Sequence, residues 1–188
     1  LSKILENTYR SVTISLMDEW TKFAKSINVD LFQVSEAIRK RSTHSNIRYP
    51  GLGVGGYCLT KDPKFAEVSA KKIFKLKNFS FPLSNYSVDI NNKMPEFAFD
   101  IIKDYFGNKL KNSSVLIMGI SYLAEVSDTR YSPSEVLYNK LQQNVKNIIL
   151  HDPYVSFWKE KNIKVPKNFP EFSKIDLLVL AVKHKIYT

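Results

Sequence analysis

Three short apolar runs decide the fold of the second half of the chain: Val115-Leu116-Ile117-Met118, Ile148-Ile149-Leu150 and Leu177-Leu178-Val179-Leu180-Ala181. Short runs without polar residues are typical of strands that are covered on both faces of a parallel sheet. Between the first two runs, Ser132 is a suitable helix N-cap, Pro133 suits the first helical position, and Glu135 would complete a capping box. This half of the chain therefore predicts a small, doubly wound α/β domain.

The first half of the chain has helical periodicity instead. Helices are predicted over residues 1–27, 30–41, 63–74 and 83–106. Asp30 should cap the second helix, Pro95 should kink or divide the fourth, and Gly107 should end it. Because the sequence opens within helical periodicity and lacks an initiator Met, we expect it to be a piece of a longer protein.

Composition indicates an ordinary globular protein. Hydrophobic residues make up 44% of the 188 positions and charged residues 24%, and no apolar run approaches the roughly 20 residues of a membrane span. We therefore expect a cytoplasmic protein with no membrane partner. The single cysteine excludes an internal disulfide framework and a cysteine-rich zinc site.

The chain is basic, with 28 Lys and Arg against 18 Asp and Glu. Basic surfaces can bind nucleic acid, but these charges are scattered, and no basic run alternates with stacking aromatics. We predict no nucleic-acid partner, and a phosphate-bearing small molecule accounts for part of the excess. His44, His151 and His184 are too dispersed to predict a metal site, so surface or capping roles are expected for each.

One glycine-rich segment carries most of the chemistry: Tyr49-Pro50-Gly51-Leu52-Gly53-Val54-Gly55-Gly56-Tyr57-Cys58-Leu59-Thr60-Lys61-Asp62-Pro63. It holds four of the six glycines, so its backbone must turn sharply or approach something closely. A dinucleotide fingerprint follows a strand and opens a helix, whereas this loop follows a polar stretch and leads to a thiol. Cys58, Lys61 and Asp62 supply a nucleophile, a cation and a carboxylate. From the residues alone, a nucleophilic Cys58 and a buried, inert Cys58 are equally open.

Two other stretches accompany this segment in a fixed order. Lys3-Ile4-Leu5-Glu6-Asn7-Thr8-Tyr9-Arg10 lies before it, and residues 119–122 with 128–133 lie after it, continued by His151-Asp152-Pro153-Tyr154. Together they resemble the central-helix, active-site and C-terminal signatures of the UDP-glucose/GDP-mannose dehydrogenase family. Within that family, the chain resembles the branch that acts on UDP-N-acetylhexosamines.

The resemblance implies two domains in this chain. Residues 1–107 would form an all-helical central domain that holds the catalytic cysteine and forms a homodimer. Residues 108–188 would form a Rossmann-like UDP-binding α/β domain, which we expect to be incomplete. We expect the family's N-terminal NAD-binding domain to be missing from this sequence, because no strand with a glycine-rich turn precedes the first predicted helix. NAD would therefore be bound mainly by that missing domain, no cofactor-binding residue is assigned, and the fragment alone should be inactive.

The resemblance also implies a mechanism. Family members oxidise the C6 alcohol of a nucleotide sugar to a carboxylate with two NAD⁺ in succession, which serves polysaccharide biosynthesis. Cys58 would attack the intermediate aldehyde, and the thiohemiacetal would become a thioester that water cleaves. Lys3 would donate to the C6 oxygen, Asn7 would position that oxygen or a water, and Asp62 would support the water or the thiol proton. Taken alone, Lys3 and Asn7 also fit a solvated helix face.

Substrate contacts are expected from the loop and from one distant arginine. Lys61 would tie the loop or contact the substrate. The other predicted substrate-binding residues are Tyr49, Gly51, Gly53, Gly55, Gly56 and Arg130.

Two further expectations concern binding surfaces. A UDP site should lie near residues 119–122, where loop amides and helix N-termini converge at the carboxyl ends of the strands. The dimer should use the helix over residues 83–106, which carries more apolar residues than one small domain can cover.

Leu123 departs from the family pattern, because the family usually has a basic residue after the aromatic that matches Tyr122. This departure favours an alternative function, a noncatalytic UDP-sugar-binding or dimerisation module.

Overall fold

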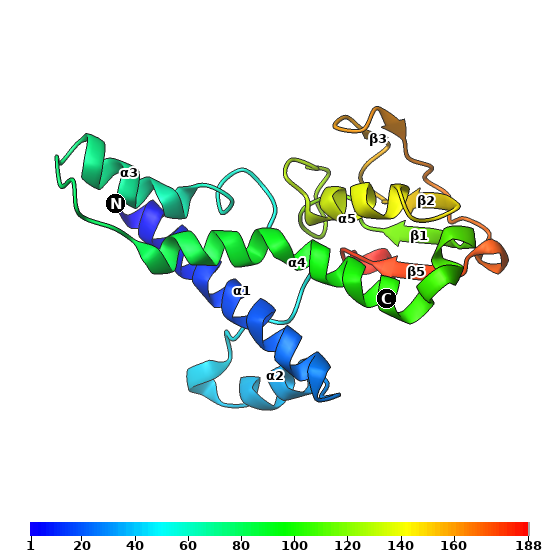
Figure 1. Ribbon diagram of the computed structural model, residues 1–188, viewed down its shortest axis with the longest axis horizontal. Helices are drawn as coiled ribbons and strands as arrows, with labels where there is room; N and C mark the ends of the chain where they lie inside the picture. The colour runs from blue at the N-terminus through cyan, green and yellow to red at the C-terminus, as the bar shows by residue number, and fades with distance from the viewer. Residues whose placement is uncertain (188) are drawn as a thin grey trace. The chain divides into compact units, whose positions relative to one another are not determined.

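The computed structural model describes residues 1–187. They form two compact units, and the boundary between the units along the chain lies between Lys93 and Met94. The helices are α1 (Ser2–Ser26), α2 (Leu31–Arg39), α3 (Asp62–Lys72), α4 (Pro82–Phe106) and α5 (Pro133–Gln142) (Figure 1). The strands are β1 (Ser114–Met118), β2 (Asn147–His151), β3 (Phe157–Trp158), β4 (Ile163–Lys164) and β5 (Leu177–Leu180). Short 3₁₀ turns lie at Ser42–His44, Gly107–Asn112, Phe172–Lys174 and Lys185–Tyr187.

Helix α1 buries a polar face and exposes an apolar one. Its buried side includes four polar residues at helical spacing, Asn7, Ser11, Ser15 and Asp18. The Ser11 hydroxyl lies 3.0 Å from that of Ser87 on α4, and the Asn91 side-chain amide donates to the Ser11 carbonyl at 3.1 Å. The exposed large apolar residues of α1 and its C-cap are Leu5, Tyr9, Leu16, Trp20, Phe23 and Ile27. The predicted amphipathic helix is therefore confirmed, but most of its apolar stripe faces solvent in the single chain.

Helix α2 begins as predicted, because the Asp30 carboxylate accepts a hydrogen bond from the Phe32 amide at 2.9 Å. The helix ends at Arg39, before the predicted end at Arg41. A small apolar core of Met17, Ala24 and Leu31 holds α1 and α2 together, and Ile47 packs against it.

Helix α4 is continuous through Pro95, so the helix is not divided there, and the alternative, a kink at Pro95, stays a prediction. Proline removes one backbone donor, and this helix tolerates the loss. Gly107 follows the last residue of α4 with a φ of 51°, the left-handed conformation that a helix stop requires. The predicted stop is therefore confirmed.

The second unit contains a parallel sheet in the order β2-β1-β5. Val115 of the central strand pairs with Ile148 on one side and Leu177 on the other, so the chain winds outward from β1 in both directions. This order confirms the doubly wound, Rossmann-like fold. Strand β1 is buried from its second residue to its end, as predicted for a strand covered on both faces. Strand β5 lies at an edge of the sheet and exposes alternate residues. The short antiparallel pair β3–β4 was not predicted, since two-residue strands carry no periodicity.

Helix α5 has the predicted N-cap but lacks the predicted capping box. The Ser132 hydroxyl accepts from the Ser134 amide at 3.2 Å. The Ser132 amide donates to the Thr129 carbonyl at 3.1 Å, and the Glu135 carboxylate pairs with Lys161 at 2.9 Å. A tertiary ion pair thus replaces the local contact of Glu135.

Candidate active site

The glycine-rich loop turns twice through left-handed backbone before it reaches Cys58. Gly53 and Gly56 have φ values of 120° and 82°, which side chains other than glycine rarely adopt. By contrast, a Cβ placed on Gly51 would meet nothing within 4 Å. The left-handed backbone therefore explains why glycine stands at positions 53 and 56, whereas the space around Gly51 would admit a side chain.

Cys58 lies in the turn that leads directly into α3. Its carbonyl accepts hydrogen bonds from the Lys61 amide at 3.2 Å and the Asp62 amide at 2.8 Å. The thiol is free, and the residue is half-buried. A fully enclosed packing cysteine is therefore not what the fold produces.

Asp62 joins the Cys58 turn to the beginning of α1. Its carboxylate is 3% exposed and accepts from the Asn7 side-chain amide at 2.8 Å. Lys61 Nζ donates to the other carboxylate oxygen at 2.8 Å, and Lys3 Nζ lies 3.8 Å from the first. Three predicted site residues thus meet around the buried carboxylate of a fourth, Asp62, beside Cys58.

The charges of this cluster stabilise one another. Burial raises the pKa of Asp62, but hydrogen bonds from Lys61 and Asn7 and the nearby lysine charges outweigh it, so the pKa is lowered overall. The hydrogen bond with Asp62 in turn raises the pKa of Lys61. At neutral pH the pair is therefore ionised, and Asp62 is a weak base that orients Asn7 and the two lysines.

Lys61 is also enclosed by two aromatic rings, neither of which belongs to the predicted site. Its Nζ lies 4.4 Å from the centre of the Tyr57 ring and 4.6 Å from that of Phe65. The two aromatics stand four residues before and four residues after the lysine, a spacing that could have identified them.

Tyr49 and Arg130 take part in other contacts. The Tyr49 ring stacks on Phe32 with centroids 6.3 Å apart, and its hydroxyl donates to Glu36. Arg130 donates to the Asp128 carboxylate, with Nη2 at 2.7 Å. Their predicted roles in substrate binding stay predictions.

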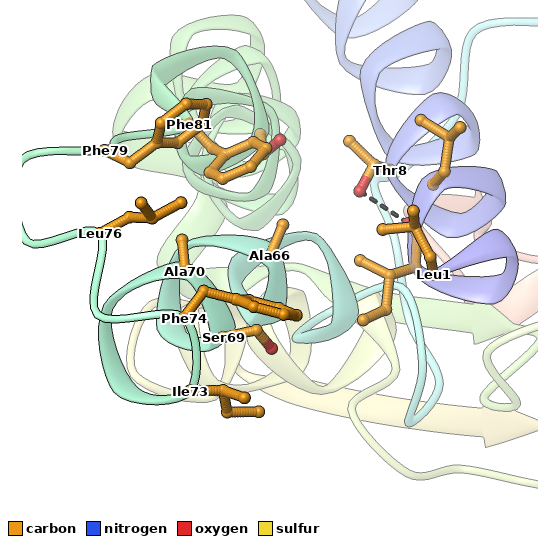
Figure 2. Close-up of a pocket in the computed structure, with 13 residues that line it drawn as sticks. Leu1, Thr8, Ala66, Ser69, Ala70, Ile73, Phe74, Leu76, Phe79 and Phe81 are labelled. Atoms are coloured by element: carbon orange, nitrogen blue, oxygen red, sulfur yellow. Dashed lines mark hydrogen bonds between the residues drawn. The ribbon is translucent and has the colours of Figure 1, made fainter.

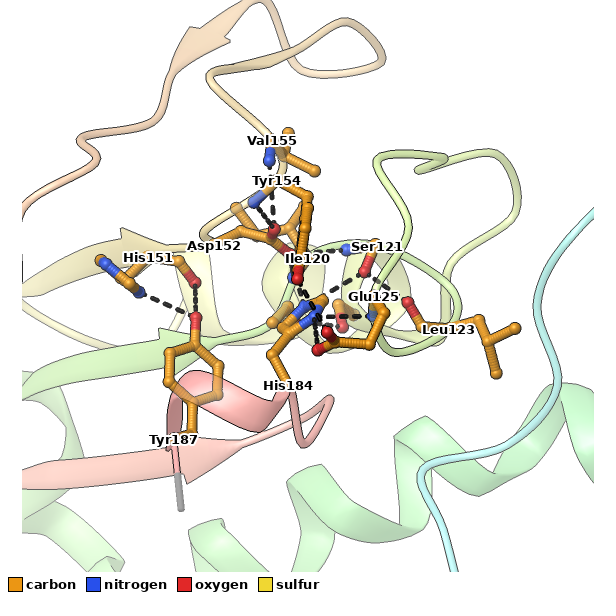
Figure 3. A network of polar contacts seen from close by, with 12 residues as sticks. Ile120, Ser121, Leu123, Glu125, His151, Asp152, Tyr154, Val155, His184 and Tyr187 are labelled. Atoms are coloured by element: carbon orange, nitrogen blue, oxygen red, sulfur yellow. Dashed lines mark hydrogen bonds and ion pairs between the residues drawn. The ribbon is translucent and has the colours of Figure 1, made fainter.

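A buried polar network organises the carboxyl end of the sheet in the second unit (Figure 3). The Asp152 carboxylate is fully buried and accepts from the amides of Ile120, Ser121, Tyr154 and Val155 at 2.7 to 3.1 Å. His184 Nε2 lies 3.2 Å from it, and the Glu125 amide donates to His184 Nδ1 at 3.0 Å. This pattern places the ring proton of His184 on Nε2, facing Asp152.

The expected roles of two histidines are therefore wrong. His184 is a buried member of the network, and His151 is buried between the Tyr187 hydroxyl at 2.8 Å and the Lys167 carbonyl at 3.1 Å. Burial of these rings depends on tertiary packing, which spacing in the sequence does not reveal. His44 is exposed as expected, with Thr43 Oγ1 at 2.8 Å from its ring.

The same network uses the amides that were expected to bind UDP. The Gly119 amide donates to the His151 carbonyl, and the Tyr122 amide donates to the Asp128 carbonyl. The amides of Ile120 and Ser121 donate to the Asp152 carboxylate. These amides therefore already have acceptors within the chain, and the predicted UDP site near residues 119–122 stays a prediction.

A hollow of about 560 Å³ opens between α1, α3 and the segment before α4 (Figure 2). Its lining is almost entirely apolar and contains none of the residues 49–63: Leu1, Ile4, Leu5, Thr8, Ala66, Ser69, Ala70, Ile73, Phe74, Leu76, Phe79, Phe81 and Ser84. Because it offers no charged side chain to a diphosphate, it is not the candidate active site. Among residues 1–187, no cluster of histidine, cysteine or acidic residues suits a metal ion, and no helix is long and apolar enough to cross a membrane.

Known proteins of a single family match this chain along almost its whole length. Residues 1–93 match the central domain of the UDP-glucose/GDP-mannose dehydrogenase family, and residues 116–188 match its UDP binding domain. A UDP-N-acetyl-D-mannosamine dehydrogenase of Pyrococcus horikoshii is 30% identical over 97% of this chain and 41% of its own length. An NDP-N-acetyl-D-galactosaminuronic acid dehydrogenase of Ralstonia solanacearum is 26% identical over 98% of this chain and 42% of its own length.

Solved structures give the same result. The UDP-D-ManNAc dehydrogenase of Pyrococcus horikoshii aligns over 96% of this chain and 41% of its own, with a TM-score of 0.74 and 28% identity. The NDP-N-acetyl-D-galactosaminuronic acid dehydrogenase of Methanosarcina mazei aligns over 99% of this chain and 41% of its own, with a TM-score of 0.85; at 22% identity it supports the fold alone. The chain spans about 41% of the length of such relatives. It belongs to the UDP-glucose/GDP-mannose dehydrogenase family.

Proposed function

We propose that this chain supplies the sulfur chemistry of a nucleotide-sugar 6-dehydrogenase, which oxidises the C6 alcohol of a UDP-N-acetylhexosamine to a uronic acid. The observation that carries the proposal is the cluster of Lys3, Asn7 and Lys61 around Asp62 at the Cys58 turn. The names of the relatives, which act on N-acetylated nucleotide sugars, support the substrate class.

Cys58 is the proposed nucleophile at the aldehyde stage. Its sulfur adds to the C6 carbonyl carbon, and the thiol proton ends on the carbonyl oxygen, which gives a thiohemiacetal. Loss of a hydride from that carbon to an oxidant, together with loss of the hydroxyl proton to solvent, leaves a thioester. Water then cleaves the C–S bond, which gives the carboxylic acid and restores the thiol. A half-buried thiol in an open turn suits this role, since a ligand can reach it.

Lys3 and Asn7 have distinct proposed roles. The Lys3 side chain is 72% exposed and only loosely held to Asp62 at 3.8 Å, so its ammonium can reach an oxygen that gains negative charge at C6. Asn7 is buried and fixed by its bond to Asp62, so it can position that oxygen or a water. Asp62 aligns both groups.

The cofactor implied by the resemblance is NAD, which accepts hydride. Among the described residues, no strand leads through a glycine-rich turn into a helix in the dinucleotide-binding pattern; β1 is followed by Gly119, over which Val182 lies too close for a side chain. We therefore assign no residue of this chain to NAD, and the proposed steps concern only the sulfur and its neighbours.

A homodimer is part of the proposal, and the exposed apolar face of α1 is its best-supported interface. Six large apolar residues from Leu5 to Ile27 lie at helical spacing and face solvent in the single chain. Exposed apolar stripes of this length mark protein interfaces. The predicted interface on α4 stays a prediction with less support, because the apolar residues that suggested it are buried or half-buried in the single chain: Ile90, Met94, Phe97, Phe99, Ile101, Ile102 and Phe106.

The alternative function, a noncatalytic UDP-sugar-binding or dimerisation module, rests on Leu123. This side chain is 54% exposed in the loop after β1, where the family pattern has a basic residue. Such a module would bind UDP-sugars without consuming them.

Mass spectrometry of a family-length protein that carries this chain distinguishes the two functions. The protein is mixed with NAD⁺ and UDP-N-acetylmannosamine, UDP-N-acetylglucosamine or UDP-glucose, then quenched in acid and digested. The proposal expects a uronyl thioester on the peptide that contains Cys58 and release of the uronic acid. Binding of a UDP-sugar with neither adduct nor product would favour the noncatalytic module.

A further inference from the structure

The connection between α3 and α4 presents lysines and large apolar side chains together to solvent. Residues 71–79, from the last turn of α3 to the segment before α4, are called the lysine turn below. Its large apolar side chains are between 50% and 69% exposed: Ile73, Phe74, Leu76 and Phe79. Its lysines are exposed as well: Lys71, Lys72, Lys75 and Lys77. Between Glu67 and Asp89 the chain has no acidic residue and no arginine, so this surface is both basic and apolar.

The lysine turn is held in shape by its own backbone and by one carboxylate. Lys75 has a φ of 59°, and the Leu76 amide donates to the Ala70 carbonyl at 2.9 Å, which closes the end of α3. The Glu67 carboxylate accepts from the Phe81 amide at 3.1 Å and so ties α3 to the beginning of α4. A partner that binds the exposed side chains therefore need not order the segment first.

The apolar side of the lysine turn continues into the hollow beside α1 (Figure 2). All four of its large apolar residues line this hollow of about 560 Å³, together with Leu1 and Ile4 of the first helical turn. Apolar groups that enter such a space lose their contact with water. The turn thus borders one continuous apolar region, with lysines at the neighbouring positions.

An anionic lipid surface fits this combination better than another protein does. Four lysines against Glu67, which pairs with Lys71, leave an excess of three positive charges on the turn. Protein interfaces are depleted in lysine and enriched in arginine, whereas segments that bind the surface of a bilayer combine lysines with phenylalanine and leucine. A lysine can also bury its methylene chain among apolar groups while its ammonium reaches a headgroup.

We propose that the lysine turn binds the surface of a membrane that contains anionic lipids. The ammonium groups contact lipid phosphates, and the four apolar side chains insert among the headgroups. Such binding needs no membrane-spanning segment, and the lack of one was the only basis for expecting no membrane partner. The proposal does not depend on the role of Cys58, because the lysine turn contains no residue of the candidate active site.

Sedimentation with lipid vesicles tests the proposal on the family-length protein. One set of vesicles is phosphatidylcholine alone, and the other has equal parts of phosphatidylcholine and phosphatidylglycerol. The protein should sediment with the anionic vesicles and stay in solution with the neutral ones. Raising NaCl from about 0.1 M to about 1 M should weaken the binding, since the screening length falls from about 10 Å to about 3 Å.

Two single variants locate the contact. Lys72→Gln removes one lysine of the turn and should weaken binding about fivefold. Phe74→Ser removes one exposed ring and should weaken binding about tenfold. Lys64→Gln on α3 and Tyr105→Ser on α4 are the matched controls and should bind as the unmodified protein does. All four side chains are exposed, so the substitutions leave the core intact.

Four results would overturn the proposal. They are equal binding to anionic and neutral vesicles, unmodified affinity of either Lys72→Gln or Phe74→Ser, an effect of Lys64→Gln as large as that of Lys72→Gln, and no binding of the family-length protein to anionic vesicles. In the last case, binding by the 188-residue chain alone would assign the turn to a contact within the longer protein. The proposed function stands or falls separately, on whether turnover of the family-length protein needs Cys58.

Discussion

Asp18 is a buried carboxyl that should make the first unit less stable as pH rises. It is 1% exposed, and neither carboxylate oxygen has a hydrogen-bond partner. Burial raises its pKa from 3.8 to about 7, although the charge of Lys22 opposes the change. In the unfolded chain the same group loses its proton near the ordinary value. Between the two pKa values the folded state binds the extra proton, so the free energy of unfolding falls as pH rises.

Asp18→Asn removes this titration while keeping the shape of the side chain. A difference between 3.8 and about 7 corresponds to at most about 4 kcal/mol, since each pKa unit is worth 1.36 kcal/mol. The variant should therefore match the unmodified chain near pH 4 and become more stable than it by up to about 4 kcal/mol above pH 7.

Urea denaturation at several pH values, followed by far-ultraviolet circular dichroism, measures this difference. Asp89→Asn is the control, because Asp89 is an exposed carboxylate paired with Lys64, and its effect should stay within about 0.5 kcal/mol. Equal stability of Asp18→Asn and the unmodified chain at both ends of the pH range would show that the carboxyl is hydrated or paired, and would refute this reasoning.

Three further predictions follow from other parts of the molecule. Asp152→Asn replaces a carboxylate oxygen that accepts from backbone amides with an amide nitrogen that cannot, so the second unit should lose about 3 to 5 kcal/mol of stability; an unfolding midpoint in urea equal to that of the unmodified chain would contradict this. Trp20→Glu places a charge in the exposed stripe of α1 and should convert a dimer to monomers in analytical ultracentrifugation, whereas a dimer of unchanged affinity would exclude this face. In the family-length protein, Lys3→Ala removes a donor to a charged oxygen and should lower the turnover number by about 10² to 10³; a loss below tenfold would assign Lys3 to the solvated helix face.

Local signals in the sequence were sufficient for most of the fold. Asp30, Ser132 and Gly107 mark helix ends because a cap needs only a side chain or a left-handed residue at one position. The central strand is likewise evident, since a run such as Val115-Leu116-Ile117-Met118 is short for a buried helix and typical of a strand covered on both faces. The capping box failed because Lys161, distant in sequence, competes for Glu135.

The candidate site needed more than local pattern. Asn7 and Asp62 are in direct contact but far apart in the sequence, and only the family resemblance suggested that they belong together. The enclosure of Lys61 and the burial of His151 and His184 depend on side-chain packing, which neither periodicity nor motif spacing encodes. The apolar stripe on α1 was evident as a pattern, but its exposure required the fold.

The role of Cys58 as nucleophile is the central claim, and the rate of uronic acid formation by Cys58→Ser tests it most directly. The measurement uses the family-length protein with NAD⁺ and the UDP-N-acetylhexosamine that it oxidises best, with Asp89→Asn as the surface control. A serine hydroxyl without an adjacent base is a far weaker nucleophile toward an aldehyde than a thiolate. We expect Cys58→Ser to form no uronic acid above background and Asp89→Asn to keep the unmodified rate. Uronic acid formation by Cys58→Ser at the unmodified rate would contradict it and make Cys58 a packing residue.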